Sequence, residues 1–80
     1  MVTAEQKAAA VALKDKGNKA FKEHIWPDAI SFYDQAIEKD DTEPSFFCNR
    51  AQAQIKVEAY GYAIADATKA IELDRNYIKV

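Results

Sequence analysis

The chain has 80 residues and a net charge of -2, and 49% of its residues are apolar and 30% charged. This composition excludes a disordered chain. The low number of glycines and prolines, two of each, disfavours an all-β fold built on tight turns. The charge gives little attraction to nucleic acid, and the apolar run at 8–13 is too short to span a membrane and lacks a signal-peptide cleavage pattern. We therefore expect one small domain located in the cytoplasm, with the nucleus as a second location, and no nucleic-acid or membrane partner.

Local signals at the start of the chain predict two helices. The first covers 4–23, a segment that is rich in alanine and strongly helix-forming. The second begins at Pro27, because the first helical position needs no N–H group, and it ends at 40–42. Apolar side chains spaced by three or four residues give this second helix an inward-facing stripe, which consists of Ala29, Ile30, Tyr33, Ala36 and Ile37.

Two more helices follow in the second half of the chain. Pro44 begins the third helix, which continues to about residue 57, and the fourth covers about 60–73. Residues 78–80 resemble the start of a fifth helix. The side chains expected to face inward are Phe47, Ala51 and Ile55 in the third helix, and Ala63, Ile64, Ala67, Ala70 and Ile71 in the fourth.

An internal repeat organises these helices. Residues 29–40 and 63–74, which read AISFYDQAIEKD and AIADATKAIELD, are identical at six of twelve positions with an offset of 34. This period is the length of two antiparallel helices and their turns, the unit of a helical solenoid. Gly17 and Ala51 recur at the same offset where helices approach closely, and the ring of Tyr33 can cover Gly17. We predict an all-α fold of stacked helix pairs in a right-handed superhelix, with the first helix of each pair lining the concave wall.

The repeated positions resemble the tetratricopeptide repeat, which has a small residue in its first helix and an alanine, an aromatic residue and an alanine in its second. The matching residues are Gly17, Ala29, Tyr33 and Ala36, and then Ala51, Ala63, Ala67 and Ala70. The sequence departs from the family pattern where it expects proline (Asp41 and Arg75), tyrosine (Ala20 and Gln54) and the second aromatic residue (Ala67). The resemblance divides the chain into an N-terminal helix extension (1–9), a first repeat (10–43), a second repeat (44–77) and the start of a third (78–80).

A closer resemblance covers roughly residues 10–80. The run AYGYAIADATKAIELD at 59–74, followed by Tyr77, Ile78 and Lys79, is similar to the second repeat of the serine/threonine protein phosphatase 5 family. In that family three repeats precede a metal-dependent phosphatase domain. The resemblance therefore implies a non-catalytic, regulatory segment of a phosphatase that autoinhibits the catalytic domain. No catalytic domain, cofactor site or metal-ligand set is expected within these residues, because a Gly-rich phosphate loop and a nucleophile–His pair are both missing.

The family resemblance also implies a carboxylate clamp, which grips the terminal Asp of a peptide. The matching residues are Lys14, Asn18, Asn49 and Lys79, and the fifth clamp position falls beyond Val80. The implied partner is the C-terminal Met-Glu-Glu-Val-Asp tail of the heat-shock protein 90 class of chaperones, with the heat-shock protein 70 class as an alternative.

The residues support a clamp on physical grounds as well. Lys14 and Asn18 are four apart and project from one helical face, and Lys22 extends this stripe by another turn. Amide groups donate hydrogen bonds to carboxylate oxygens while ammonium groups neutralise the charge. Phe21 and Ile55 on the inner wall either contact apolar side chains upstream of the terminal Asp or pack between stacked helices. By spacing alone, a solvated helix face remains the competing interpretation.

Other single residues receive structural interpretations, and one alternative function remains. Cys48, the only cysteine, excludes an internal disulfide and is expected to be a small apolar filler. His24, the only histidine, is expected at a helix end, and Trp26 as a plug between helices. Three tyrosines are expected to seal the seam toward a third repeat, namely Tyr60, Tyr62 and Tyr77. The alternative function is a structural module that self-associates through the exposed end of the second repeat.

Overall fold

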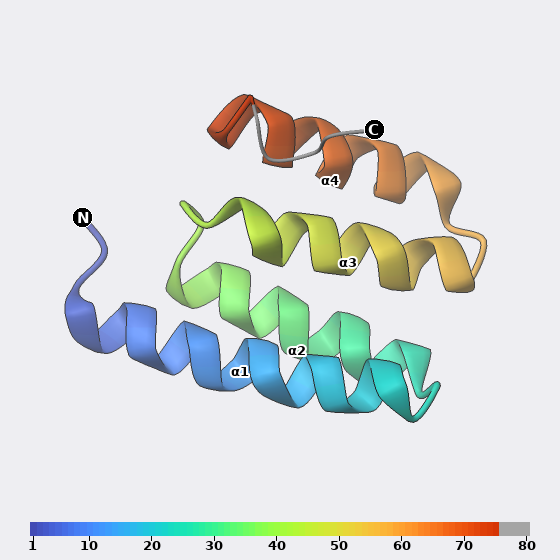
Figure 1. The fold of residues 1–80 in the computed structure, drawn as a ribbon, viewed down its shortest axis with the longest axis horizontal. Coiled ribbons are helices and arrows are strands. Elements are labelled where there is room, and N and C mark those ends of the chain that lie inside the picture. The colour runs from blue at the N-terminus through green and yellow to red at the C-terminus, as the bar shows by residue number, and fades with distance from the viewer. Residues whose placement is uncertain (76–80) are drawn as a thin grey trace.

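The computed structural model of the chain describes residues 1–75. These residues form four α-helices and no strand: α1 (Ala4–Lys22), α2 (Trp26–Lys39), α3 (Pro44–Lys56) and α4 (Tyr60–Leu73). Figure 1 shows consecutive helices running in opposite directions, with α1 and α2 forming one hairpin and α3 and α4 a second. The predicted all-α architecture is confirmed. The expected fifth helix at 78–80, and the sealing role of Tyr77, lie outside the described residues.

The helix ends follow from local chemistry. Thr3 caps α1 in a capping box with Gln6, in which each side chain bonds the other residue's backbone N–H. Both α2 and α3 carry proline in their first turn, where a missing N–H group costs nothing. Asp40 and Asp74 end α2 and α4 in the same way, since each donates its N–H to the carbonyl of an alanine four residues earlier.

The two hairpin turns repeat the same strained backbone. His24 and Glu58 adopt left-handed conformations, with φ of 61° and 62°, and they are 34 residues apart. This conformation lets the next residue return to the helix: the N–H of Ala59 donates to the carbonyl of Gln54 at 2.8 Å. The repeat therefore extends from the helices to the turns that join them, and His24 lies at a helix end as predicted.

The core is built from alanines with a few aromatic rings between them. One buried cluster combines Tyr33 with Ala20, Ala29 and Ala53, and a second combines Phe46 with Ala10 and Ala36. The predicted contact between Tyr33 and Gly17 is confirmed, because a Cβ atom at Gly17 would lie 2.5 Å from Cε1 of Tyr33. Small residues thus let α1 and α2 approach closely enough for one ring to fill the space between them.

Three residues that were predicted to face inward are instead exposed. Ile55, Ile64 and Ile71 have exposed fractions of 50%, 67% and 42%. Among the described residues α4 packs only on α3, so no further helix covers Ile71 or the open hollow between α3 and α4 that Ile55 and Ile64 line. The other inward positions of the third and fourth helices are buried or half-buried, as predicted: Phe47, Ala51, Ala63, Ala67 and Ala70.

Trp26 fills the space at the first hairpin turn, as predicted. Its ring meets the ring of Phe21 edge-on at 5.0 Å and stacks on His24 at 5.0 Å, while the Nζ atom of Lys56 lies 5.7 Å from its centre.

Within residues 1–75, no helix combines the length and apolar content that crossing a membrane requires. In the same range, no group of three or more His, Cys, Asp or Glu side chains gathers in a way that would hold a metal ion.

Candidate peptide-binding site

The central feature of the candidate site is a contact between two asparagine amides on neighbouring first helices. Asn18 lies on α1 and Asn49 on α3, 31 residues later in the chain. The Nδ2 group of Asn49 donates to Oδ1 of Asn18 at 3.5 Å, and both side chains are partly buried. The fold therefore brings together two of the residues that were predicted from the clamp pattern.

Tyr33 orients this amide pair, a role that was not predicted. Its hydroxyl group donates to Oδ1 of Asn18 at 2.6 Å. Burial raises the pKa of Tyr33 above its ordinary value, so the phenol stays protonated and remains a donor. Because Oδ1 of Asn18 accepts from both Tyr33 and Asn49, the amide has one defined orientation, and its Nδ2 group is left to donate to a ligand.

The sequence contained a signal for this role of Tyr33. The ring was predicted to cover Gly17, and Asn18 is the next residue on α1. A ring that spans Gly17 from α2 must end in a hydroxyl group close to the neighbouring side chain. The second use of Tyr33 therefore follows from the first, provided that the direction of the ring is known, and only the structure supplies this direction.

The predicted lysines differ in their surroundings. Lys14 lies one turn before Asn18, its side chain is only 26% exposed, and its Nζ atom is 3.2 Å from Oδ1 of Asp15. Lys22 lies one turn after Asn18 and is exposed. An anionic ligand would therefore have to compete with Asp15 for the ammonium group of Lys14, whereas Lys22 is open to solvent. Lys79 lies outside the described residues.

The two predicted apolar contacts, Phe21 and Ile55, lie in different places. Phe21 is half-buried, packs on the core around Tyr33 and meets Trp26, so packing between helices accounts for most of its surface. Ile55 faces an apolar hollow of about 250 Å³ between α3 and α4, together with Tyr60 and Ile64. Ile55 therefore lines a hollow shared with α4, whereas Asn49 of the same helix contacts α1.

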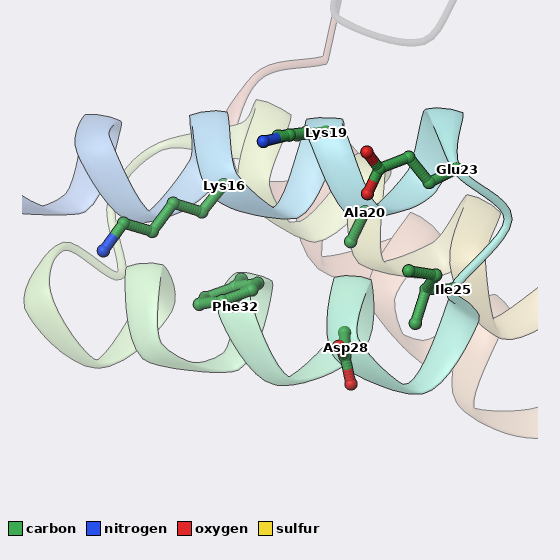
Figure 2. A pocket seen from close by; sticks show the side chains of 7 residues that line it. All are labelled: Lys16, Lys19, Ala20, Glu23, Ile25, Asp28 and Phe32. Carbon is green, nitrogen blue, oxygen red and sulfur yellow. The ribbon is translucent and has the colours of Figure 1, made fainter.

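A hollow of about 260 Å³ between α1 and α2 is shown in Figure 2. Its charged side chains are two lysines and two acids, and the ammonium ends of Lys16 and Lys19 lie away from Ile25 and Asp28. The two positive and two negative charges balance, so the hollow favours neither an anion nor a cation. We assign no ligand to this hollow.

Two similar curated proteins are phosphatases. Serine/threonine-protein phosphatase T of Aspergillus oryzae is 70% identical over 71 residues, which are 89% of this chain and 15% of that protein. Serine/threonine-protein phosphatase 5 of Homo sapiens is 47% identical over 70 residues, 88% of this chain and 14% of that protein. The chain therefore spans about one seventh of the length of these relatives. No family model matches the sequence.

Three solved structures with the same fold are repeat domains in complexes. The second TPR of Spaghetti (RPAP3), bound to HSP90 peptide SRMEEVD, is 38% identical with a TM-score of 0.88, over 91% of this chain and 68% of that chain. The first TPR of the same protein, bound to the same peptide, is 34% identical with a TM-score of 0.88, over 89% and 56%. A domain of yeast Sti1 in a pHsp70 complex is 33% identical with a TM-score of 0.86, over 88% and 56%.

The antiparallel helix pairs, the repeat of 34 residues and the small residues at the helix contacts define a helical-repeat protein of the solenoid class. The chain belongs to the tetratricopeptide repeat family. Phosphatase T and protein phosphatase 5 are among its homologues, so the resemblance seen in the sequence is confirmed.

Proposed function

We propose that this chain binds the C-terminal carboxylate end of a chaperone tail, with the Met-Glu-Glu-Val-Asp sequence of the heat-shock protein 90 class as the preferred ligand. The observation that carries the proposal is the contact between the amides of Asn18 and Asn49, which Tyr33 holds in one orientation. Similar domains in solved structures carry HSP90 peptide SRMEEVD, and another is in a pHsp70 complex, which supports the same class of ligand for this chain.

The chemistry of the site suits two carboxylates at one chain end. The Nδ2 groups of Asn18 and Asn49 would donate to carboxylate oxygens, and the ammonium groups of Lys14 and Lys22 would neutralise their charge. A charge-assisted hydrogen bond contributes about 1.5–3 kcal/mol net. Two or three such bonds with a small apolar contact suit a micromolar complex, on the order of 8 kcal/mol. The affinity should fall as salt rises, because the lysines are near the surface.

The direct test is a titration of the 80-residue chain with a pentapeptide Met-Glu-Glu-Val-Asp that has a free C-terminus, compared with the same peptide as its C-terminal amide. We expect saturable shifts of the Asn18 and Asn49 side-chain amide signals in nuclear magnetic resonance spectra, and much weaker binding of the amidated peptide. Equal affinity for both peptides would rule out recognition of the carboxylate end.

A pair of variants separates the amide site from the general surface of α3. Asn49→Ala removes one donor and should weaken the tail peptide at least tenfold. Gln52→Ala removes an exposed amide one turn further along the same helix and should leave the affinity unchanged. If both variants bind the peptide as tightly as the parent chain, the peptide lies elsewhere.

We propose further that in a longer phosphatase this segment is regulatory and non-catalytic, and that it inhibits the phosphatase domain until the tail peptide binds. The names of the homologues, serine/threonine-protein phosphatases, support the link to this enzyme class. Adding the chain to the catalytic domain of a homologous phosphatase should slow hydrolysis of p-nitrophenyl phosphate, and the tail peptide should reverse the effect. An unchanged rate would contradict the proposal.

The cytoplasm, with the nucleus second, remains our proposed location, which a fluorescent fusion can test.

A second candidate function is self-association through the uncovered side of the second helix pair. Exposed apolar side chains of α4 favour it, since an uncovered apolar face of this kind is a common association surface. These side chains are Tyr60, Tyr62, Ile64, Ile71 and Leu73. Sedimentation should then show dimers at high concentration, and Ile64→Lys should convert them to monomers. A monomeric mass at every concentration excludes this function without affecting the tail-binding proposal.

A further inference from the structure

The contact between the two amides of the candidate site is sensitive to the orientation of α3. The Nδ2 atom of Asn49 lies 3.5 Å from Oδ1 of Asn18. Typical N–H···O hydrogen bonds are shorter, at about 2.7–3.2 Å. Because a helix with its side chains is about 10–12 Å across, an atom at its edge moves by about 1 Å when the helix rolls by about 10°. A roll of this size away from α1 would therefore separate the two amides.

The apolar contacts of α3 give little resistance to such a roll. Phe46 and Ala53 are buried in the two core clusters together with residues of α1 and α2. They are seven residues apart, so they lie almost on one line along α3. Hydrophobic contact has no preferred direction, and α1 and α3 share few contacts. A directional contact elsewhere on α3 is therefore needed to fix its orientation about this line.

Arg50 makes directional contacts on the other side of the apolar line from Asn49, since adjacent residues on a helix point about 100° apart. Its Nε and Nη2 groups donate to the two carboxylate oxygens of Asp66 on α4, each at 2.7 Å. Its Nη1 group donates to Oδ1 of Asp34 on α2 at 2.8 Å. Figure 1 shows α3 between α2 and α4, so one guanidinium group joins α3 to both of these neighbours.

The surroundings of Arg50 make this bridge rigid. The planar guanidinium group fixes the directions of its N–H groups, so three bonds to two helices determine its position. Its Cζ atom also lies 5.7 Å from the centre of the buried Phe47 ring on α3. The side chains of Arg50 and Asp66 are only 21% and 9% exposed, so water competes little for their hydrogen bonds. These bonds raise the pKa of Arg50, which therefore stays charged.

We propose that Arg50 is a positioning residue for the candidate tail-binding site. Its bridge between α2 and α4 fixes the orientation of α3 that keeps Asn49 opposite Asn18. As far as it concerns affinity for the tail, this inference rests on the proposed function. It makes Asp66 important for tail binding, although Asp66 lies on α4 and bonds to Arg50 rather than to either amide.

Asp66→Asn tests the bridge at the end that is remote from the amides. The new amide keeps one oxygen as an acceptor but sets an NH₂ group against an N–H group of Arg50. We expect the Met-Glu-Glu-Val-Asp peptide to bind about threefold to tenfold more weakly in calorimetry, as coupling within one hydrogen-bonded network implies. General electrostatics predicts the opposite, because the loss of a carboxylate favours an anionic peptide. Glu72→Gln makes the same charge change at an exposed position of α4 and should leave the affinity within about twofold.

A double-mutant cycle separates positioning from a general loss of stability. If Arg50 acts through Asn49, then Asp66→Asn should change the affinity by less than about twofold once Asn49→Ala has removed that amide. A loosened fold would instead weaken the peptide by the same factor in both backgrounds. Asp34→Asn removes the charge at the half-exposed end of the bridge and should show the same pattern with a smaller loss. It replaces Asp66→Asn if circular dichroism shows that the latter does not fold.

The position of Asn49 can also be measured in the chain without peptide. In nuclear magnetic resonance spectra of the 80-residue chain labelled with nitrogen-15, Asp66→Asn should move the Asn49 side-chain amide signals toward those of a solvated amide. Glu72→Gln should leave these signals in place. The measurement remains decisive even if the parent chain binds the free-acid and amidated tails equally, a result that refutes the proposed function alone.

Three results would overturn the inference. Asn49 signals that stay unchanged in a folded Asp66→Asn variant would show that core packing alone orients α3. Unchanged affinity of this variant, in a parent chain that does recognise the free carboxylate end, would show that the bridge has no effect on the site. An equal loss of affinity with and without Asn49 would show that the bridge acts on stability and not through the amide.

Discussion

Replacing Gly17 with alanine tests whether the close approach of α1 and α2 determines both the stability and the binding site. An added Cβ atom would lie 2.5 Å from Cε1, 2.7 Å from Cδ1 and 3.2 Å from Cζ of Tyr33. Ordinary carbon–carbon contacts are about 3.5–4.0 Å, so three atoms of one rigid ring would have to move together. The ring is 2% exposed and its hydroxyl group is bonded to Asn18, which leaves it little freedom to do so.

Two opposing effects set the size of the change. Alanine in a helix interior is about 1 kcal/mol more favourable than glycine. Overpacking a core costs about 1–3 kcal/mol, and a clash with three buried ring atoms belongs in the upper half of that range. We therefore expect Gly17→Ala to lower the free energy of unfolding by about 1–2 kcal/mol. For a chain of this size the melting temperature would fall by about 4–16 °C.

Gly61→Ala is the matched control. No atom lies within 4 Å of a Cβ atom at this position, and Gly61 is also helical. Only the propensity effect remains, so this variant should be more stable than the parent chain by up to about 1 kcal/mol. Thermal unfolding followed by circular dichroism measures both variants. If Gly17→Ala melts at or above the temperature of the parent chain, the argument from the close helix contact is wrong.

Three further variants test the site and the turns. Tyr33→Phe removes the hydroxyl group that orients Asn18, so the chain should lose about 1 kcal/mol of stability. It should also bind the tail peptide several-fold more weakly in calorimetry. Unchanged affinity would show that the Asn18 amide does not need the hydroxyl group to orient it. Asp15→Asn frees the ammonium group of Lys14 from an ion pair worth about 0–1 kcal/mol, so the tail peptide should bind up to about fivefold more tightly. This gain in affinity should be smaller at high salt. Weaker binding would contradict the competition between Asp15 and the peptide. Glu58→Gly relieves a left-handed residue and should raise the free energy of unfolding by about 0.5–1 kcal/mol in urea titrations, whereas a loss would mean that the Glu58 side chain stabilises the turn.

The helices and their pairing could be predicted because their signals are local or strictly periodic. Pro27 and Pro44 lie in first turns, and the period of 34 residues implies two helices and their turns. The same period marked Gly17 as a small residue at a helix contact, which the ring of Tyr33 was predicted to cover. The left-handed turns at His24 and Glu58 were not predicted, because neither residue is the glycine that usually marks this conformation.

The candidate site could be predicted only in part. Asn18 and Asn49 were identified from a family pattern and they do meet. The pair between Lys14 and Asp15 was missed, since adjacent residues on a helix do not normally face each other and only the bend of the lysine side chain joins them. Ile55 was assigned to the inner wall with the amides, and in the structure it lines the hollow between α3 and α4.

By itself, the sequence determined that this chain is a set of antiparallel helix pairs with small residues at their contacts, because periodicity records which residues must be apolar or small. The tertiary structure decided which neighbours those helices have. It left Ile64 without cover, joined Tyr33 to Asn18, and let Arg50 bridge Asp34 and Asp66 on two helices that do not pack on each other. These features depend on the angle at which each side chain leaves its helix and on which helix stands opposite, and neither quantity is set by local sequence.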